Sequence, residues 1–303
     1  MKIVLGVCTY RRPVELRKLL DALPLLNGNP DLHVVVADND DAGEGRAVCS
    51  ALPADYPFNV ISISVSSSGI SAVRNTLTNK ALSLNPDIVV FLDDDEWPEP
   101  QWLSELLRVQ AQYNADLVGG PTRPVFPDSA DPELLENPYY GADLNLPDGS
   151  VCQLQAGGNF LAKASVLEPY SPAFFLEAFS HSGSEDLAFF SKLAQDGYHM
   201  RWAAHAVVHE PVPDSRLAPD WLRQRVINIH NSRVRVMQLL QPSLKASVVR
   251  ILKTVALASV AGGMTLLGLV SPSYRTAARL LRWKLIGKLT AHVGSMTVRG
   301  ETY

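Results

Sequence analysis

The chain has 303 residues and a formal net charge of −4; 47% of its residues are hydrophobic and 19% are charged. This ordinary globular composition suits one large domain with an appendage. Three cysteines at positions 8, 49 and 152 lack metal-type spacing, which argues against a disulfide framework and favours a reducing cytosolic setting. We expect the N-terminal residues to form a first strand rather than a signal peptide, because they lack a long apolar core.

Charge is distributed unevenly along the chain. Residues 242–303 contain nine Lys or Arg and one acidic residue, whereas the preceding part contains eighteen bases and thirty acids. We therefore predict two regions, a larger one at residues 1–240 and a basic, apolar, helical one at residues 241–303. The two regions are expected to meet different partners.

The larger region begins with alternating strands and a helix. Residues 3–7 and 34–37 are short apolar runs typical of buried strands, and leucines lie between them at helical spacing. A strand, helix and strand in this order predict a parallel sheet whose strands end at one shared edge, where α/β proteins bind ligands. We expect Thr9, Asp38 and Asp93 to lie along that edge.

A third strand, residues 60–65, leads into small residues and a helix that contains Arg74. Small residues at the start of a helix let an anion approach the backbone, and Arg74 adds positive charge nearby. The segment contains neither GxGxxG nor GxxxxGK[ST]. It therefore predicts neither a dinucleotide-binding turn nor a P-loop.

The most informative stretch is an apolar strand, residues 88–92, that ends in Asp93, Asp94 and Asp95. Adjacent carboxylates repel one another, so a folded chain tolerates three of them only where they are well solvated or where positive charge lies among them. A divalent cation that bridges a diphosphate would supply that charge. The alternative is a solvated turn after a strand.

Two loop segments follow. Residues 121–150 are rich in Pro, Asp, Asn and Gly and carry aromatic residues, a pattern that fits either a lid or a tolerated insertion, with a slight preference for the lid. The turn Gly157-Gly158-Asn159 combines a permissive backbone with an amide, which suits close approach of a sugar or phosphate. A tight bend between strands explains it equally well.

Two further motifs carry acidic or metal-binding residues. Glu185 and Asp186 open a predicted helix, where carboxylates are also favoured by the helix dipole alone. His209 ends a predicted strand and precedes an acid. A single His is more often structural than a metal ligand, but its place at the sheet edge favours the ligand role.

Together these motifs resemble the inverting glycosyltransferases of family 2, which have the GT-A fold. The resemblance covers roughly residues 1–235 and is carried by the segments VCTYRRP, VVADND, GISAVRN, FLDDDEWP and GSEDLAFF. It is strongest toward bacterial exopolysaccharide and lipid-linked oligosaccharide transferases. The resemblance implies an α/β catalytic domain with a mixed, mainly parallel sheet flanked by helices. The apolar and basic pattern of the residues beyond it predicts a C-terminal helical membrane-associating extension.

The resemblance also implies the donor and the metal. A family member binds a nucleotide-sugar, usually a UDP-sugar, and Mg²⁺ or Mn²⁺ neutralises the leaving diphosphate. Asp95 is expected to bind the metal, with His209 completing its shell or contacting the diphosphate. The residues expected to hold the nucleotide-sugar are Thr9, Tyr10, Arg12, Asp38, Arg74, Asp93 and Asp94.

By the same resemblance, Asp186 is the general base that deprotonates the acceptor hydroxyl, and Glu185 lies beside it. One base acting opposite the leaving group gives inversion by direct displacement. Gly157, Gly158 and Asn159 are expected to contact the acceptor, a saccharide or a polyprenyl-diphosphate-linked saccharide. A nucleotidyltransferase-like enzyme and a non-catalytic subunit of a polysaccharide assembly complex are the alternatives.

The C-terminal region contains seventeen uncharged residues, 254–270, followed by a basic segment with Trp283. This pattern favours peripheral or monotopic attachment to an anionic membrane surface, at the cytoplasmic face of the inner membrane. A soluble helical hairpin packed on the catalytic domain and a homo-oligomer formed through these helices remain open. The segment carries no nucleic-acid-binding motif and is too apolar for that role.

Overall fold

The computed structural model describes residues 1–28, 30–67, 69–180 and 183–294. Within the described residues the chain forms two compact units, one built from residues 1–180 and 185–212 and the other from residues 183–184 and 213–294. The end of the region predicted as 241–303 lies outside the described residues.

The first unit contains a seven-stranded mixed sheet with the strand order β3-β2-β1-β4-β8-β6-β9. The strands β1 to β4 are parallel to one another, whereas β8 runs antiparallel to both of its neighbours. The strand bounds are Ile3–Thr9 (β1), Leu32–Asp38 (β2), Asn59–Ser64 (β3), Ile88–Asp93 (β4), Leu117–Gly119 (β6), Phe160–Lys163 (β8) and Met200–Trp202 (β9).

A second, three-stranded sheet has the order β5-β10-β7. Its strands are Trp97–Pro98 (β5), Thr122–Val125 (β7) and Val208–Pro211 (β10). The segment predicted as a lid or insertion thus contributes a strand, β7, and a short helix, Pro132–Leu135 (α5). Tyr140 from this segment is buried and packs edge-on against Phe126.

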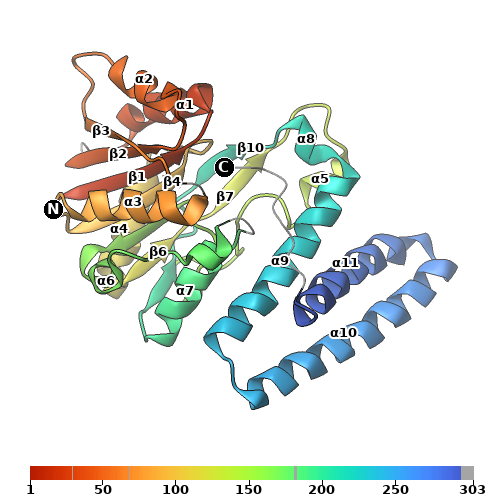
Figure 1. Cartoon of the computed structure of the whole chain (residues 1–303). Coiled ribbons are helices and arrows are strands. Elements are labelled where there is room, and N and C mark those ends of the chain that lie inside the picture. Colours follow the sequence, from red (N-terminus) through yellow and green to blue (C-terminus); the bar gives the residue numbers. More distant parts are fainter. Residues whose placement is uncertain (29, 68, 181–182, 295–303) are drawn as a thin grey trace. The chain divides into compact units, whose positions relative to one another are not determined.

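Helices cover both faces of the main sheet (Figure 1). Those of the first unit are Pro13–Ala22 (α1), Glu44–Ser50 (α2), Ile70–Leu82 (α3), Trp102–Tyr113 (α4), Ala164–Leu167 (α6) and Glu185–Gln195 (α7), with 3₁₀ turns at Leu23–Leu25, Glu168–Tyr170 and Glu177–Phe179. The strands and helices predicted within residues 3–92 are confirmed.

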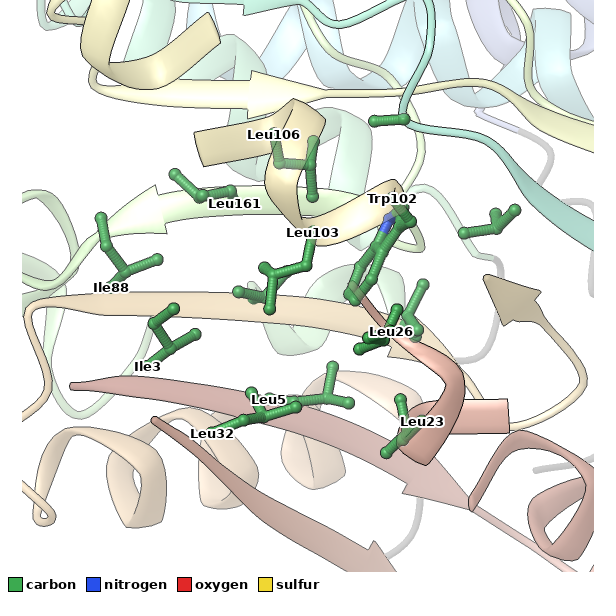
Figure 2. Packing of buried hydrophobic residues seen from close by; sticks show 14 of the residues in the cluster. Ile3, Leu5, Leu23, Leu26, Leu32, Ile88, Trp102, Leu103, Leu106 and Leu161 are labelled. Carbon is green, nitrogen blue, oxygen red and sulfur yellow. The ribbon is translucent and has the colours of Figure 1, made fainter. Parts of the chain in front are cut away.

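Strand β1 shows why its sequence is apolar throughout. Leu5 belongs to the core that contains Trp102 of α4, whereas the adjacent Val4 belongs to the core on the other face with Phe91. Successive residues of a strand point to opposite faces, so a strand covered on both faces must be apolar at every position. Figure 2 shows Leu103 and Leu106 of α4 packed over Ile3, Leu5 and Ile88.

The second unit consists of helices. Its longer members are Pro219–Leu240 (α9), Leu244–Val270 (α10) and Arg275–His292 (α11), with Asp214–Leu217 (α8) before them and a 3₁₀ turn at Pro272–Tyr274. The apolar segment predicted at 254–270 is therefore part of a longer helix that begins at Leu244. The side chain of Ser243 caps this helix by accepting a hydrogen bond from the amide of Ala246. Within the described part of the chain, α10 is the one helix that is long and apolar enough, by length and composition, to cross a membrane.

Candidate active site

The predicted donor residues meet where β1 and β4 end. These strands are parallel neighbours, with Cys8 opposite Asp93, so the residues that follow them lie side by side at the carboxyl edge of the sheet. Thr9 Oγ1 donates to Asp94 Oδ2 at 2.8 Å. Arg12 Nη1 lies 3.2 Å from Asp94 Oδ1 and 2.7 Å from Asp95 Oδ2. The loop after β1 is thereby fastened to the triple aspartate.

The carboxylates of this turn are buried together. Burial raises the pKa of Asp94 to about 6. The pKa of Asp95 is raised to about 7, mainly by burial and next by the negative charge of Glu210. The pKa of Glu96 is raised well above its ordinary value, mainly by burial and next by the negative charge of Asp93. Negative charge is therefore costly at this end of the site, and a cation bound there would offset that cost.

The turn has the chemistry of a Mg²⁺ or Mn²⁺ site, since its side chains offer oxygen atoms. Among the described residues, no three His, Cys, Asp or Glu side chains form a complete metal cage. Mg²⁺ is commonly held by one or two carboxylates together with substrate phosphates and water, so a partial protein ligand set suits an ion that arrives with a diphosphate. The residues present fit such an ion.

Arg74, on α3, connects this turn to the rest of the site. Its guanidinium donates to Asp93 Oδ1 at 3.0 Å and to the carbonyl of Gly157 at 2.8 Å, and its Nε lies 3.4 Å from Glu185 Oε1. The side chain is nearly buried. Burial alone would lower the pKa of Arg74, but Asp93 and Glu185 outweigh it, so the pKa is raised and Arg74 remains a cation.

Both positions of the Gly157-Gly158 pair in the predicted acceptor turn must be glycine, because buried side chains leave no room for a Cβ atom there. A Cβ on Gly157 would lie 2.5 Å from Arg74 Nη1, and a Cβ on Gly158 would lie 2.6 Å from Glu96 Oε1. Glu96 accepts hydrogen bonds from the amide of Asp93 and the hydroxyl of Thr122. It therefore holds the triple aspartate against this turn, a role that sequence reasoning missed because the acid follows three others.

The predicted base, Asp186, lies on the same turn from the other side. Its Oδ2 accepts from the amide of Gly157 at 3.0 Å and its Oδ1 from the amide of Leu187 at 2.6 Å. Asp186 is half-buried, whereas Glu185 is 3% exposed beside Arg74. The structure thus brings Asp93, Arg74, Gly157 and the acidic start of α7 into one cluster.

Asn159 has a structural role. Its Nδ2 donates to the carbonyls of Pro121 and Ala206, and its Oδ1 accepts from Trp102 Nε1 at 2.7 Å. The side chain is buried, and these three bonds engage both ends of the amide. Acceptor binding at this turn stays a prediction for Gly157 and Gly158, whereas the Asn159 side chain serves the fold.

Of the predicted nucleotide residues, Asp38 is the last residue of β2, and Tyr10 lies in the loop after β1. Asp38 is fully buried and accepts from the amides of Asp40 and Arg46, so its carboxylate shapes the loop into α2. Gly45 is needed there, because a Cβ would lie 2.6 Å from Thr9 Cγ2. Tyr10 is half-buried, and the guanidinium of Arg11 lies 4.9 Å from its ring centre. A direct contact from either residue to a base stays a prediction.

His209 and its neighbour Glu210 act in different places. His209 Nε2 lies 3.0 Å from Glu99 Oε1, and its ring stacks on Trp97. Glu210 is one of the acids whose negative charge acts on Asp95 and Glu96. Sequence reasoning selected the His and passed over the acid, although alternation along a strand sends adjacent side chains to opposite faces.

Comparison with known proteins identifies the family. Residues 5–170 match the model described as "Glycosyl transferase family 2". The chain is also 32% identical over 229 residues to the succinoglycan biosynthesis protein ExoM of Rhizobium meliloti (strain 1021), which covers 74% of this chain and 72% of ExoM. The chain belongs to glycosyltransferase family 2.

Solved structures confirm the GT-A type of fold predicted from the sequence. The mannosyltransferase PcManGT from Pyrobaculum calidifontis, solved with GDP-Man and Mn²⁺, matches 96% of this chain and 87% of its own with a TM-score of 0.65 at 18% identity. The structure of S. aureus TarS 1–349 with UDP-GlcNAc matches 100% of this chain and 98% of its own, with a TM-score of 0.56 at 12% identity. This chain spans 39% of a longer TarS chain. At these identities the likeness concerns the fold.

Replacing Asn159 with Ala should destabilise the fold. The change leaves Trp102 Nε1 and two carbonyls without the buried amide, which should lower the free energy of unfolding by about 2–4 kcal/mol in urea titrations. Asn114→Ala is the matched control: Asn114 also has a positive φ, but its side chain meets Lys163 at the surface, so its loss should cost less than about 1 kcal/mol. Equal losses in the two variants would contradict the structural role of Asn159.

Proposed function

We propose that this family 2 protein is an inverting, metal-dependent glycosyltransferase that moves a sugar from a nucleoside-diphosphate donor to an acceptor hydroxyl by single displacement. In this step the acceptor oxygen forms a bond to the anomeric carbon while the bond from that carbon to the diphosphate oxygen breaks. The acceptor proton passes to Asp186, and the nucleoside diphosphate leaves with the electron pair. One displacement inverts the anomeric configuration.

The observation that carries this proposal is the contrast between the two acids that open α7. Glu185 is buried against Arg74, whereas Asp186 is half-buried, with its carboxylate oriented by the amides of Gly157 and Leu187. A general base must reach its substrate, and an oriented, accessible carboxylate meets that requirement. Asp186 is thus assigned as the catalytic base, and Glu185 as a positioning residue that acts through Arg74.

At the donor end, Asp95 would hold Mg²⁺ or Mn²⁺, with Glu210 as the further carboxylate whose charge acts on it. When bound, the ion would neutralise the diphosphate of the leaving group. The ligand role predicted for His209 would require its side chain to leave Glu99. Thr9, Arg12, Asp93 and Asp94 line the same turn and would position the donor.

The comparisons suggest the substrate classes. TarS and PcManGT were solved with UDP-GlcNAc and GDP-Man, and ExoM is named for succinoglycan biosynthesis. We assign a nucleotide-sugar donor, with UDP-sugar preferred, and a saccharide or polyprenyl-diphosphate-linked saccharide acceptor in polysaccharide assembly. A lipid-linked acceptor would place the enzyme at the cytoplasmic face of the inner membrane, through the apolar and basic helices of the second unit.

Replacement of Asp186 by Asn should abolish transfer and leave donor binding intact. The amide keeps the shape and an acceptor oxygen but cannot take the proton, so kcat should fall at least about 100-fold. Nucleoside diphosphate release across a panel of donors and acceptors would measure this, with donor affinity followed by calorimetry. Asp196→Asn, directly after the C-terminal end of α7, is the control, because Asp196 contacts Lys192 and Tyr170 at the surface. An Asp186→Asn enzyme with near wild-type turnover would refute the assignment.

Replacement of Asp95 by Asn should remove the effect of metal on donor binding. The wild-type protein should bind UDP more tightly with Mg²⁺ or Mn²⁺ than with EDTA, whereas the Asn variant should bind with the same weak affinity in both. Asp55→Asn, which changes an exposed carboxylate after α2, should behave as wild type. Metal-enhanced UDP binding retained by Asp95→Asn would place the ion elsewhere.

A further inference from the structure

Helix α10 exposes apolar side chains over most of its surface. Its buried residues are Thr254, Ala261 and Gly268, one every seven residues, so they form a single narrow stripe. Leucine, valine and isoleucine side chains are exposed around the rest of the helix: Leu244, Val248, Val249, Ile251, Leu252, Val255, Val260, Leu266, Leu267, Leu269 and Val270. An apolar surface this extensive indicates a partner that is itself apolar.

Helix α11 runs antiparallel along the same stretch of α10 (Figure 1). At one end Arg275 Nε donates to the carbonyl of Gly268 at 3.2 Å, and at the other Thr254 Oγ1 lies 3.2 Å from His292 Nε2. These contacts join the helices at both ends of the uncharged segment of α10. Any position that α10 takes in a membrane is therefore shared by α11.

Charged residues occupy α11 along its whole length: Arg275, Arg279, Arg282, Lys284 and Lys288. A lysine or arginine at the centre of a bilayer is strongly disfavoured. If α10 crossed the membrane, α11 would carry these five cations through the hydrocarbon. The packing of the two helices thus opposes a span, even though α10 is long and apolar enough for one.

The exposed face of α11 fits the boundary between water and lipid. Arg275, Arg279, Arg282, Ile286 and Leu289 recur at intervals of four and three residues, so they share one face, and all five are exposed. The arginines come first and the apolar residues follow. The guanidinium of Arg279 also lies 5.5 Å from the ring centre of Trp283, an aromatic residue of the kind favoured at membrane interfaces.

The charge of the helical unit identifies the lipid. Residues 221–294 contain twelve Lys or Arg and no Asp or Glu. Cations from three helices surround Lys288. Burial lowers the pKa of Lys288, and the positive charges of Lys253 on α10, Arg233 on α9 and Lys284 on α11 lower it further. A positive surface beside an exposed apolar helix complements a bilayer that carries anionic phosphates.

We infer that α10 and α11 form a monotopic anchor that lies in the plane of an anionic phospholipid membrane, with the apolar side chains of α10 in the acyl boundary and the arginines of α11 at lipid phosphates. This inference rests on the membrane association proposed above and specifies its geometry and its lipid. A second copy of this chain covering α10 is the competing occupant.

Flotation with vesicles tests the lipid surface. The full-length protein should float with phosphatidylcholine vesicles that contain phosphatidylglycerol, and weakly with phosphatidylcholine alone. The double variant Leu266→Gln with Leu269→Gln should partition about tenfold or more less strongly onto both kinds of vesicle. Arg279→Gln with Arg282→Gln should reduce it about tenfold on the anionic vesicles only.

Matched controls place the same changes on the first unit. Leu25→Gln with Leu135→Gln alters two exposed leucines, and Arg17→Gln with Lys80→Gln removes two positive charges. Both pairs should float as wild type. Equal loss in the controls, or equal binding to both kinds of vesicle, would overturn the assignment of the anionic lipid surface. Absence of flotation with concentration-dependent dimers in sedimentation would instead show that a second copy covers α10.

Cysteine labelling tests the geometry. Gln241→Cys and Ser273→Cys lie before and after α10, and both positions are exposed. In a bacterial expression host, an in-plane anchor should let a membrane-impermeant maleimide reach both cysteines in inverted vesicles and neither in spheroplasts, above the background of the wild-type chain. Labelling from opposite sides would show that α10 spans the membrane.

The outcomes separate this inference from the proposed function. Opposite-side labelling would overturn the in-plane geometry and leave membrane association and sugar transfer standing. A protein that binds no vesicle and fractionates as soluble would overturn both the anchor and the membrane association. Nucleoside diphosphate release measured on the same preparations reports on transferase activity independently of either result.

Discussion

The site depends on one buried cation. Arg74 reaches the last residue of β4 through Asp93, the turn before β8 through the carbonyl of Gly157, and the start of α7 through Glu185. Removing a buried charge from such a group leaves its partners uncompensated, so these contacts are mutually dependent. The guanidinium therefore fixes the donor end of the site relative to the acidic end that holds the proposed base.

The remaining features follow from the way charge is arranged around that cation. Asp94, Asp95 and Glu96 are buried close together at the end of β4, where burial and mutual repulsion raise their pKa values. Arg12 offsets part of this negative charge. A nucleotide diphosphate alone would add repulsion, so donor binding at this turn calls for an accompanying cation. The electrostatics of the protein thus favour a donor that arrives as a metal complex.

The sequence predicted the parts of this structure that depend on local pattern. Apolar runs marked the strands, and polar residues directly after them marked the carboxyl edge of the sheet. The family resemblance added the roles proposed for Asp95 and Asp186, which spacing alone does not supply. The outcome also shows that an acid run after a strand is informative only when its distant partners are known.

The sequence could not predict contacts between segments that are far apart along the chain. Arg74 and Gly157 are 83 residues apart, and Trp102 and Asn159 are 57 residues apart. Asn159 looked like a binding residue because an amide beside two glycines suits a ligand, but its partners are three other segments of the fold. The sequence also did not show that α11 packs along α10. Hydropathy describes each helix separately, whereas the ability of α10 to cross a membrane also depends on the charged helix packed against it.

The central claim is that Asp93 and Glu185 are coupled through Arg74, and a double-mutant cycle tests it most directly. The variants Asp93→Asn, Glu185→Gln and their combination would be compared by kcat/KM for sugar transfer, first with Arg74 and then with Arg74→Lys. The account predicts a coupling energy of about 1 kcal/mol or more with Arg74, and little with Lys, whose single ammonium cannot bridge both carboxylates. Additive effects in the presence of Arg74 would contradict it.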